Sequence, residues 1–269
     1  MNENTNFITL DLAFNKIKSE VLTSYNITDH KDKVIFQTID IENDKQRMYD
    51  PSSDAFIPLK YTQFADGDIV ISTISEYLDF AKKLYELYSE NLFSKNAFEY
   101  IFEHLSVRVR DYDLRPYTAN EEQEKYLIIY GLGDQEHIAH TKIQTSTVQI
   151  KSDTSYINVT DSYTELLHDR IYYGTLLGNK IVSIVGTNQV VESSQMPTAV
   201  DIGLETHEDY RQNGYAHSNV AAISKYLINK GHVVKYCCNN KNTNSIKTAI
   251  SSGFKVVAYE KTIWCVNMD

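Results

Sequence analysis

The chain has 269 residues, of which 42% are hydrophobic and 23% charged, and this composition is typical of a globular protein rather than a disordered one. Its formal net charge of −10 argues against a nucleic-acid partner, because proteins that bind phosphate backbones concentrate Lys and Arg. The length allows one large domain or two modest ones. We therefore expect a folded protein that does not bind nucleic acid.

The cysteines and the apolar runs of the sequence indicate the cellular compartment of the protein. The three cysteines are Cys237, Cys238 and Cys265, an odd number without the spacing of a disulfide framework or a zinc site. The first residues lack the basic and apolar regions of a signal peptide, and no run approaches 18 apolar residues. We expect a reducing, cytoplasmic setting and no membrane partner.

The first part of the chain predicts helices with irregular segments between them. Apolar residues at helical spacing predict a helix from Leu10 to about Leu22. A strand is expected from Val34 to about Ile41, and turns and loop from Tyr49 to Gly67, where Pro and Ser residues gather. Thr73 and Glu76 have the spacing of a capping box, so a helix is expected to begin there and to continue through Tyr88. A second helix is expected to begin near Ser94.

The middle of the chain has weaker signals. Tyr126–Tyr130 is typical of a short buried strand, and another extended segment is expected within 141–157. Asp161 is a candidate N-cap of a short helix over 164–167. His137 and His140 have no third ligand nearby in sequence, so we expect no metal. We expect an N-terminal α/β domain over residues 1–120, contributing to the acceptor cleft, and a second domain over 121–269.

The last hundred residues have the clearest pattern. A hairpin is predicted from Ile171–Leu176 and Lys180–Val185, followed by a strand at Ala199–Thr206 and a helix from Ala216 to Gly231. The strand alternates, with Val200, Ile202 and Leu204 on one face and Asp201, Gly203 and Glu205 on the other. The remaining predicted elements are a strand at 233–238, a helix opened by Asn244 and Ser245, and two strands at 256–258 and 262–266.

The turn between the predicted strand and helix is a candidate anion site. A helix that begins directly after a strand presents unpaired backbone N–H groups and the positive end of its dipole. Gly214 allows a phosphate to approach the backbone closely, Ala216 keeps the start of the helix uncrowded, and Arg211 can add a charge-assisted hydrogen bond.

These residues resemble a known family. Tyr210-Arg211-Gln212-Asn213-Gly214-Tyr215-Ala216, followed by Asn244-Ser245 and Gly253-Phe254, is similar to the GCN5-related N-acetyltransferase (GNAT) superfamily. Within the superfamily the chain most resembles a two-domain branch that includes zwittermicin-resistance acetyltransferases. The resemblance implies an α/β (α+β) fold with a mixed, mostly antiparallel sheet flanked by helices. It covers about Tyr126–Asp269.

The resemblance also implies a cofactor and its contacts. Acetyl-CoA is the expected co-substrate, with its pyrophosphate at Arg211, Gln212, Asn213, Gly214, Tyr215 and Ala216 and a further contact at Asn244. The pantetheine arm is expected to pair with Leu204, Glu205 and Thr206, and a backbone N–H there would stabilise the oxyanion. No metal is implied.

The implied reaction is the direct attack of an amine on the bound thioester. Asp201 is the first candidate for the general base and Glu205 the second. Many family members have a tyrosine, acting as general acid, at the position of Ala249, so Tyr215, Tyr236 or Tyr259 would have to replace it or the thiolate leaves unaided. Acyl transfer through Cys237 or Cys238 is an alternative mechanism.

The function that we expect is acetyl transfer to the amine of a small molecule or to a peptide amino terminus. The small molecules considered are an aminopolyol or aminoglycoside antibiotic, a polyamine and an amino acid. The alternatives are a catalytically weak acyl-CoA sensor or scaffold, and a protein whose functional part is its N-terminal domain. A homodimer is possible.

Overall fold

The computed structural model describes residues 9–28, 30–39, 49–50, 55–105, 107–109, 112–116, 124–132, 138, 140–151, 156–160, 169–189 and 199–267. The predicted short helix over 164–167, its cap Asp161 and the side chain of His137 lie outside these residues. Within the described part of the chain, no helix is both long and apolar enough to span a lipid bilayer.

The chain forms two compact units that do not follow one another along the sequence. Unit 1 contains Met1–Glu20, Ile129–Cys238 and Asn242–Val257. Unit 2 contains Val21–Ile128, Asn239–Lys241 and Ala258–Asp269. Both units are therefore made of segments that are distant in sequence.

Unit 1 is built on a mixed sheet. Its strand order is β14-β7-β13-β12-β11-β10-β8, and β9 adds to β11. The pairs β8–β10, β10–β11 and β11–β12 are antiparallel, whereas β12–β13 is parallel. The strands are β7 (Leu127–Leu132), β8 (Thr147–Ile150), β9 (Ile157–Asn158), β10 (Tyr172–Leu177), β11 (Lys180–Thr187), β12 (Ala199–Thr206), β13 (Val233–Asn239) and the first residues of β14 (Phe254–Asn267).

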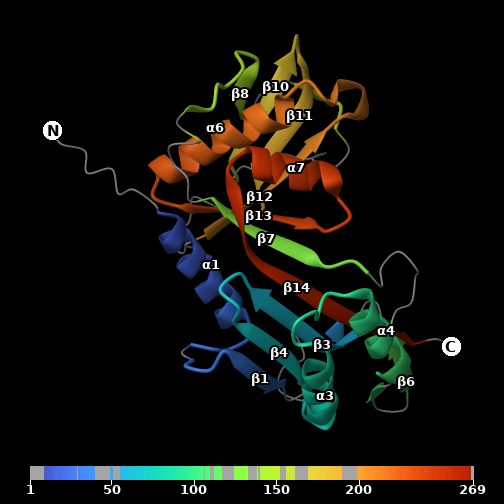
Figure 1. Ribbon diagram of the computed structural model, residues 1–269. Helices are drawn as coiled ribbons and strands as arrows, with labels where there is room; N and C mark the ends of the chain where they lie inside the picture. Colours follow the sequence, from blue (N-terminus) through green and yellow to red (C-terminus); the bar gives the residue numbers. More distant parts are fainter. Residues whose placement is uncertain are drawn as a thin grey trace. The chain divides into compact units, whose positions relative to one another are not determined.

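Two helices follow the parallel strands of unit 1. Helix α6 (Tyr215–Asn229) comes after β12, and helix α7 (Thr243–Ser251) comes after β13. Figure 1 shows α6, in orange, lying along β8, β10 and β11, and α6 is in contact with all three strands and with β12. Its buried face is apolar apart from Ser218, Asn219 and Ser224. Two of them, Ser218 and Asn219, bond to residues outside the helix and hold α6 against the neighbouring strands.

Unit 2 contains a second group of strands. Strand β1 is parallel to β4, and the pairs β4–β3, β3–β14 and β14–β6 are antiparallel. The elements are β1 (Val34–Ile39), β2 (Tyr49–Asp50), β3 (Ala55–Phe64), β4 (Ile69–Ile74), η1 (Ser75–Tyr77), α3 (Leu78–Tyr88), α4 (Lys95–His104), β5 (Val107–Val109), β6 (Tyr112–Pro116) and the rest of β14. Helix α1 (Leu10–Ser24) has residues in both units.

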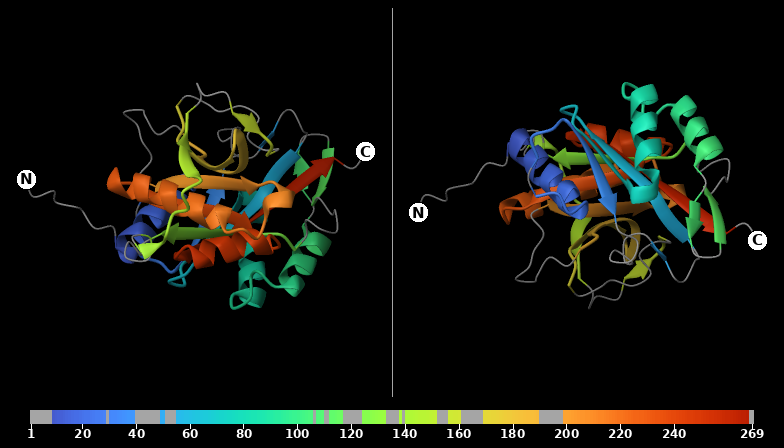
Figure 2. Two further views of the ribbon diagram at one scale, coloured as in Figure 1. Left: turned by 90° about the horizontal axis from the view of Figure 1, so that it is seen from above. Right: turned by 90° about the horizontal axis from the view of Figure 1, so that it is seen from below.

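The core of unit 2 lies between its strands and its two helices. Figure 2 shows α3 and α4 side by side on the same side of β3 and β4. Leu59, Tyr61 and Ile71 from the strands are fully buried against Leu84 and Ile101 from the helices. Burial of a large apolar side chain contributes about 1.5–3 kcal/mol, so each of these residues stabilises the unit appreciably.

Most of the predicted elements are confirmed, and so is the fold class of a mixed, mostly antiparallel sheet flanked by helices. The helix predicted near Ser94 begins with that residue as its N-cap, and the Ser94 hydroxyl accepts a hydrogen bond from the Ala97 N–H. The strand predicted over Ala199–Thr206 has those bounds in the structure. The helix expected to end at Gly231 stops at Asn229, and Gly231 adopts φ 83°.

Three predictions are wrong. The segment between Tyr49 and Gly67, which was expected to be a loop, contains the ten-residue strand β3. Pro58 is tolerated in this strand because it lies where the register between β3 and β14 shifts, so that its missing N–H interrupts no hydrogen bond between the strands. Thr73 is not a helix cap but part of β4, and its hydroxyl donates to the Pro58 carbonyl at 2.9 Å. The two strands expected near the C-terminus are one continuous strand, β14, since Tyr259–Lys261 pair with β3.

Gly131 is a close-packed position of unit 1 that predicts a stability effect. A Cβ added there would lie 2.8 Å from Cδ1 of Ile17 and 3.1 Å from Cγ2 of Val257. Because the core around a strand has little room to relax, we expect Gly131→Ala to lower the free energy of unfolding by about 1–3 kcal/mol. Denaturant unfolding measures this. Adding Ile17→Val, which removes the closest methyl group, should recover part of the loss, and additive effects would contradict the packing explanation.

Candidate active site

The candidate site of unit 1 begins where strand β12 separates from its parallel neighbour. Four residue pairs, from Ala199↔Val233 to Ile202↔Tyr236, join β12 to β13, and the register described between the two strands ends there. On its other side β12 stays paired with β11 as far as Thr206. The second half of β12, Gly203–Thr206, therefore diverges from β13 while it remains fixed to β11.

The loop after β12 turns the chain into helix α6. A single 3₁₀ turn (Glu208–Tyr210) is followed by two residues with positive φ, Gln212 at 65° and Gly214 at 75°. Gly214 is the N-cap of α6, in the left-handed conformation that glycine adopts at little cost. The first intrahelical bond runs from the Ser218 N–H to the Gly214 carbonyl at 3.0 Å. The backbone N–H groups of Tyr215 and Ala216 come before that bond, at the positive end of the helix.

Arg211 connects this loop to the diverging strand. Its Nε donates to the Thr206 carbonyl at 3.2 Å, and the side chain is exposed. Since a guanidinium group has five N–H donors, this bond orients the group and uses one of them. Asn213 fixes the loop from within, because its Nδ2 donates to the carbonyls of Tyr210 and Arg211 at 3.1 Å each.

A network of buried and partly buried polar side chains lies beneath the loop and was not predicted. The Gln144 amide nitrogen Nε2 donates to the Asn213 carbonyl at 3.0 Å, and the Gln144 backbone N–H donates to Ser218 Oγ at 2.8 Å. Ser218 Oγ lies 2.7 Å from Thr147 Oγ1 on β8. The loop and the first turn of α6 are therefore attached to the neighbouring strand by side chains, in addition to the main chain.

Asn219 is the centre of this network. Its side chain is fully buried, and its Oδ1 accepts hydrogen bonds from Thr147 and from Thr175 on β10, both at 3.0 Å. Its Nδ2 donates to Ser183 Oγ on β11 at 3.0 Å. Ser183 in turn lies 2.8 Å from Thr206 Oγ1 and 3.3 Å from the Glu205 carbonyl. One residue of α6 thus holds three strands of the sheet.

The direction of each hydrogen bond in the network follows from the protons available. Thr147 gives its only hydroxyl proton to Asn219, so Ser218 donates to Thr147 and accepts from the Gln144 N–H. When Ser183 donates to the Glu205 carbonyl, it accepts from Asn219 and from Thr206. Every hydroxyl proton in the network then has an acceptor. A fully satisfied buried network is rigid and specifies one arrangement.

Asp201, the predicted general base, is placed by β12 among polar and charged groups. Asn188 donates twice to Asp201, from its side chain to Oδ2 at 2.9 Å and from its backbone to the carbonyl at 2.8 Å. The Asp201 backbone N–H donates to Gln189 Oε1 at 2.8 Å, and Lys235 on β13 is the register partner of Asp201. The second carboxylate oxygen, Oδ1, is buried and has no hydrogen-bond partner among the described residues.

These surroundings set the proton affinity of Asp201. Burial raises the pKa of the carboxyl group above its ordinary value. The Asn188 hydrogen bond, the Lys235 ammonium and the nearby Cys237 thiol act in the opposite direction, and the Glu20 carboxylate adds to the increase. A carboxylate with a raised pKa is a stronger base than an exposed one, which is what proton collection from an amine requires.

The other predicted residues are found on the same stretch or on α7. Glu205 lies on the same face of β12 as Asp201, roughly 13 Å further along the strand, so the two carboxylates cannot share a proton. Leu204 is half-buried opposite Val185 on β11. Asn244 is exposed in the first turn of α7, whose N-cap is Asn242, accepting from the Ser245 N–H at 3.1 Å.

The three candidate general acids differ in their surroundings. Tyr236 is 2% exposed and is the register partner of Ile202, so its side chain is on the opposite face of the sheet from Asp201, and burial raises its pKa to about 12. Tyr259 belongs to a cluster of rings in unit 2, where it packs against Phe93 and Tyr126. Tyr215 is half-buried at the start of α6. Ala249 is fully buried in α7, so its position offers no acid.

The cysteines are free thiols. Burial raises the pKa of Cys238 above its ordinary value and that of Cys265 to about 12. Both groups are therefore poor nucleophiles, because the thiolate is the reactive form. As for metals, the His, Cys, Asp and Glu side chains that the structure describes form no group of three that could hold an ion.

Sequence reasoning predicted the strand, the loop and the helix but missed the network beneath them. Gln144, Thr147, Thr175 and Ser183 are ordinary polar residues of the strands and their connections. The one available signal was Asn219 itself, an amide in the apolar stripe of a predicted helix next to Val220 and Ile223. A buried amide requires partners, although the sequence does not say which.

Comparison with known proteins gives similarity in structure only. No protein-family model and no curated protein sequence matches the chain. Similar solved structures include a GNAT-family acetyltransferase from Novosphingobium aromaticivorans DSM 12444, which is 13% identical over 61% of this chain and 71% of that chain, with a TM-score of 0.43. A tandem GNAT protein from the clavulanic acid biosynthesis pathway is 10% identical over 63% of this chain and 57% of that chain, with a TM-score of 0.39. A conserved protein of unknown function from Staphylococcus epidermidis ATCC 12228 is 13% identical over 86% of this chain and 98% of that chain, with a TM-score of 0.43.

Proposed function

We propose that the protein is an acetyl-CoA-dependent N-acetyltransferase of the GNAT type, acting on the amine of a small molecule or on a peptide amino terminus. The observation that carries this proposal is the geometry of β12. The strand diverges from β13 after Ile202 and leads through a loop with a left-handed Gly214 into the N-terminus of α6. One stretch of chain therefore presents a strand edge for a pantetheine arm and, directly after it, an anion site for a pyrophosphate.

Acetyl-CoA would bind along this stretch. The first N–H groups of α6 and the Arg211 guanidinium would hold the pyrophosphate, with Gln212 and Asn213 forming the wall of the loop. The diverging residues Leu204–Thr206 would pair with the pantetheine amides, and one of their N–H groups would donate to the thioester oxygen. Asn244 would contact the cofactor from α7.

The chemical step would be direct acyl transfer in a ternary complex. The neutral amine attacks the thioester carbonyl, a C–N bond forms, and the C–S bond breaks as the thiolate of CoA leaves. Asp201, or a water between it and the amine, takes the proton that the attacking nitrogen loses. Because a CoA thiol has a pKa near that of cysteine, about 8.5, the thiolate can leave without a general acid. The raised pKa of Cys238 argues against a covalent acyl-enzyme at that residue.

Two measurements test the proposal. Calorimetry with acetyl-CoA should show binding at one site, and release of CoA thiol should follow when an amine substrate is present. The amine panel should contain an aminoglycoside, a polyamine, amino acids and short peptides with free amino termini. Absence of acetyl-CoA binding in the unaltered protein would refute the function.

A second candidate function is an acyl-CoA sensor or scaffold without turnover. Ala249, fully buried where many GNAT enzymes have a tyrosine, is the observation that favours it. Tight binding of acetyl-CoA without thiol release over the whole amine panel would support this second candidate. The assignment to the branch with zwittermicin-resistance acetyltransferases and a homodimeric state stay predictions.

The raised pKa of Asp201 predicts the pH profile of the enzyme. Asp201 must be deprotonated to accept a proton, so kcat/KM should fall as the pH drops through its pKa, which lies above the ordinary value for aspartate. In Asp201→Asn, kcat should decrease by about 10²–10⁴-fold, and the part of the acidic limb that Asp201 causes should disappear, whereas the part caused by protonation of the amine substrate stays. The pH dependence of kcat/KM for both proteins measures this. Glu205→Gln is the matched variant on the same face of β12, and loss of the acidic limb in that variant instead would assign the base to Glu205.

A further inference from the structure

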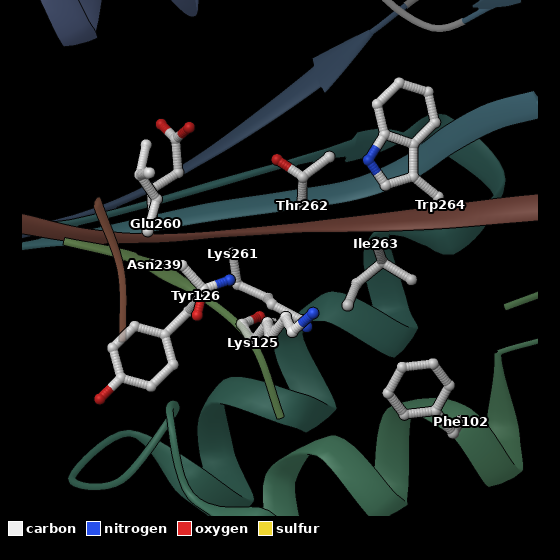
Figure 3. Close-up of a pocket in the computed structure, with 10 residues that line it drawn as sticks. Phe102, Lys125, Tyr126, Asn239, Glu260, Lys261, Thr262, Ile263 and Trp264 are labelled. Carbon is white, nitrogen blue, oxygen red and sulfur yellow. Dashed lines mark hydrogen bonds between the residues drawn. The ribbon is translucent and has the colours of Figure 1, made fainter. Parts of the chain in front are cut away.

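Unit 2 has a cavity of about 440 Å³ beside β14. Figure 3 shows that its lining comes from both sides of that strand, with Glu260, Thr262 and Trp264 on one side and Lys261 and Ile263 on the other. Its charged side chains are of both signs. The cavity therefore indicates no particular ligand, whereas the loop before α6 contains a polar contact with a consequence for the ligand of the proposed function.

This loop ends in a peptide group that the backbone alone does not hold in one orientation, the peptide between Asn213 and Gly214. Gly214 has φ 75°, and glycine adopts φ values of either sign at little cost, so the backbone allows the peptide plane before it to rotate. Among the described residues, no backbone N–H donates to the Asn213 carbonyl. A side chain must therefore fix this peptide if its orientation is to matter.

Gln144 makes that contact. Its Nε2 donates to the Asn213 carbonyl at 3.0 Å, and the same nitrogen would lie 3.2 Å from a Cβ on Gly214, so the amide packs directly against the peptide. Gln144 is itself held at its backbone, because its N–H donates to Ser218 Oγ at 2.8 Å and its carbonyl accepts from the Thr147 N–H at 3.0 Å. The amide is therefore presented to the loop by a fixed segment of chain.

The consequence lies on the opposite side of the peptide. In a trans peptide group the C=O and the N–H point in opposite directions, and the described residues contain no cis peptide bond. Gln144 approaches from the side of Ser218, one turn into α6, so the Gly214 N–H points away from the helix, as the first N–H groups of α6 do. In the described part of the chain, the N–H groups of Gly214, Tyr215 and Ala216 have no hydrogen-bond partner.

We propose that Gln144 is a positioning residue for the recognition of acetyl-CoA, because its amide turns the Gly214 N–H toward the pyrophosphate. This inference rests on the proposed function. Gln144 lies 69 residues before Asn213 in the sequence and acts through the Asn213–Gly214 peptide. Since the Gly214 proton is donated to a phosphate oxygen, Gln144 affects binding of the phosphate-bearing half of the cofactor and leaves binding of the pantetheine half unchanged.

Gln144→Met tests this role, because methionine keeps the length of the side chain and removes the donor. We expect the full-length variant to bind acetyl-CoA about tenfold more weakly, the effect of losing one hydrogen bond to a charged group. Acetyl-pantetheine, which has the same thioester without a phosphate, should bind the variant and the unaltered protein equally. Calorimetry measures the first ligand, and ligand-observed NMR, which detects weak binding, measures the second. Equal weakening for both ligands would mean general damage to the site and overturn the proposal.

The matched control is Gln149→Met, the same exchange at an exposed position of β8, and it should bind both ligands like the unaltered protein. The outcomes also separate this inference from the proposed function. If the unaltered protein binds acetyl-CoA and Gln144→Met binds it equally well, only the role of Gln144 is refuted. If the unaltered protein binds no acetyl-CoA, the proposed function and this inference both fail.

Gln144→Glu tests the donated proton itself. At neutral pH the carboxylate has no proton to donate, so acetyl-CoA should bind weakly. As the pH falls toward about 4.3, the ordinary pKa of glutamate, the carboxyl group gains a proton that it can donate to the Asn213 carbonyl. The affinity relative to the unaltered protein should then rise above that of Gln144→Met at the same pH. Recovery only to the level of Gln144→Met would mean that the lost negative charge explains it, and would contradict the positioning role.

Discussion

Replacing Arg211 with glutamate is expected to weaken acetyl-CoA binding by about 10- to 100-fold. A charge-assisted hydrogen bond to a phosphate contributes about 1.5–3 kcal/mol, and a carboxylate at the same position repels the pyrophosphate as well. The Nε bond to the Thr206 carbonyl holds the guanidinium beside the start of α6, so its loss also frees the loop from the diverging strand. Calorimetric titration with acetyl-CoA at low and at physiological salt measures the effect, and the difference between the two proteins should shrink as salt screens the charges.

The control separates a local effect from a change in net charge. Lys230→Glu makes the same change of two charges at an exposed position directly after the other end of α6, roughly 20 Å from the loop along the helix. We expect its acetyl-CoA affinity to stay within about twofold of the unaltered protein, since distant surface charges are largely screened. Equal losses in the two variants would mean that Arg211 does not contact the pyrophosphate.

The parts of this site that could be predicted are those encoded in consecutive residues. Alternation in Ala199–Thr206 gives a strand with one apolar face, and Gly214 followed by a helical pattern gives the start of α6. Both signals are local, because the period of the side chains and the backbone freedom of glycine act within a few residues. The exposed Arg211 could be placed beside the anion site for the same reason.

The parts that could not be predicted depend on contacts between distant residues. Asn219 meets Thr147, Thr175 and Ser183, which lie 72, 44 and 36 residues away in the sequence. No local pattern distinguishes these hydroxyls from surface ones. The strand β3 was missed for the same reason. Pro58 on its own indicates the end of a strand, and only the register shift against the distant strand β14 shows that the strand can continue through it.

Removing the amide of Asn219 is expected to have the largest effect on stability in unit 1. Asn219→Leu keeps the branched shape of the side chain but leaves the hydroxyl protons of Thr147 and Thr175 without an acceptor and removes the donor to Ser183, and each unsatisfied buried group costs about 1–3 kcal/mol. With partial relaxation we expect a loss of about 3 kcal/mol in the free energy of unfolding and a Tm lower by roughly 5–10 °C. Calorimetric or circular-dichroism melting measures this. Ser224→Ala, at a fully buried hydroxyl of the same helix without a hydrogen-bond partner among the described residues, should change stability by less than about 0.5 kcal/mol.

Asn219→Asp distinguishes the proposed hydrogen-bond directions from simple packing. A carboxylate can still accept from Thr147 and Thr175, but it has no proton for Ser183, and burial raises its pKa in the folded state. An acid whose folded pKa is above its unfolded value of about 3.9 is stabilising at low pH and loses that contribution as the pH rises. The variant should therefore approach the stability of the unaltered protein near about pH 4 and fall progressively behind it toward neutral pH. Stability equal to that of the unaltered protein at every pH would mean that the Nδ2 proton is not essential to the network, and that Asn219 holds α6 by its shape alone.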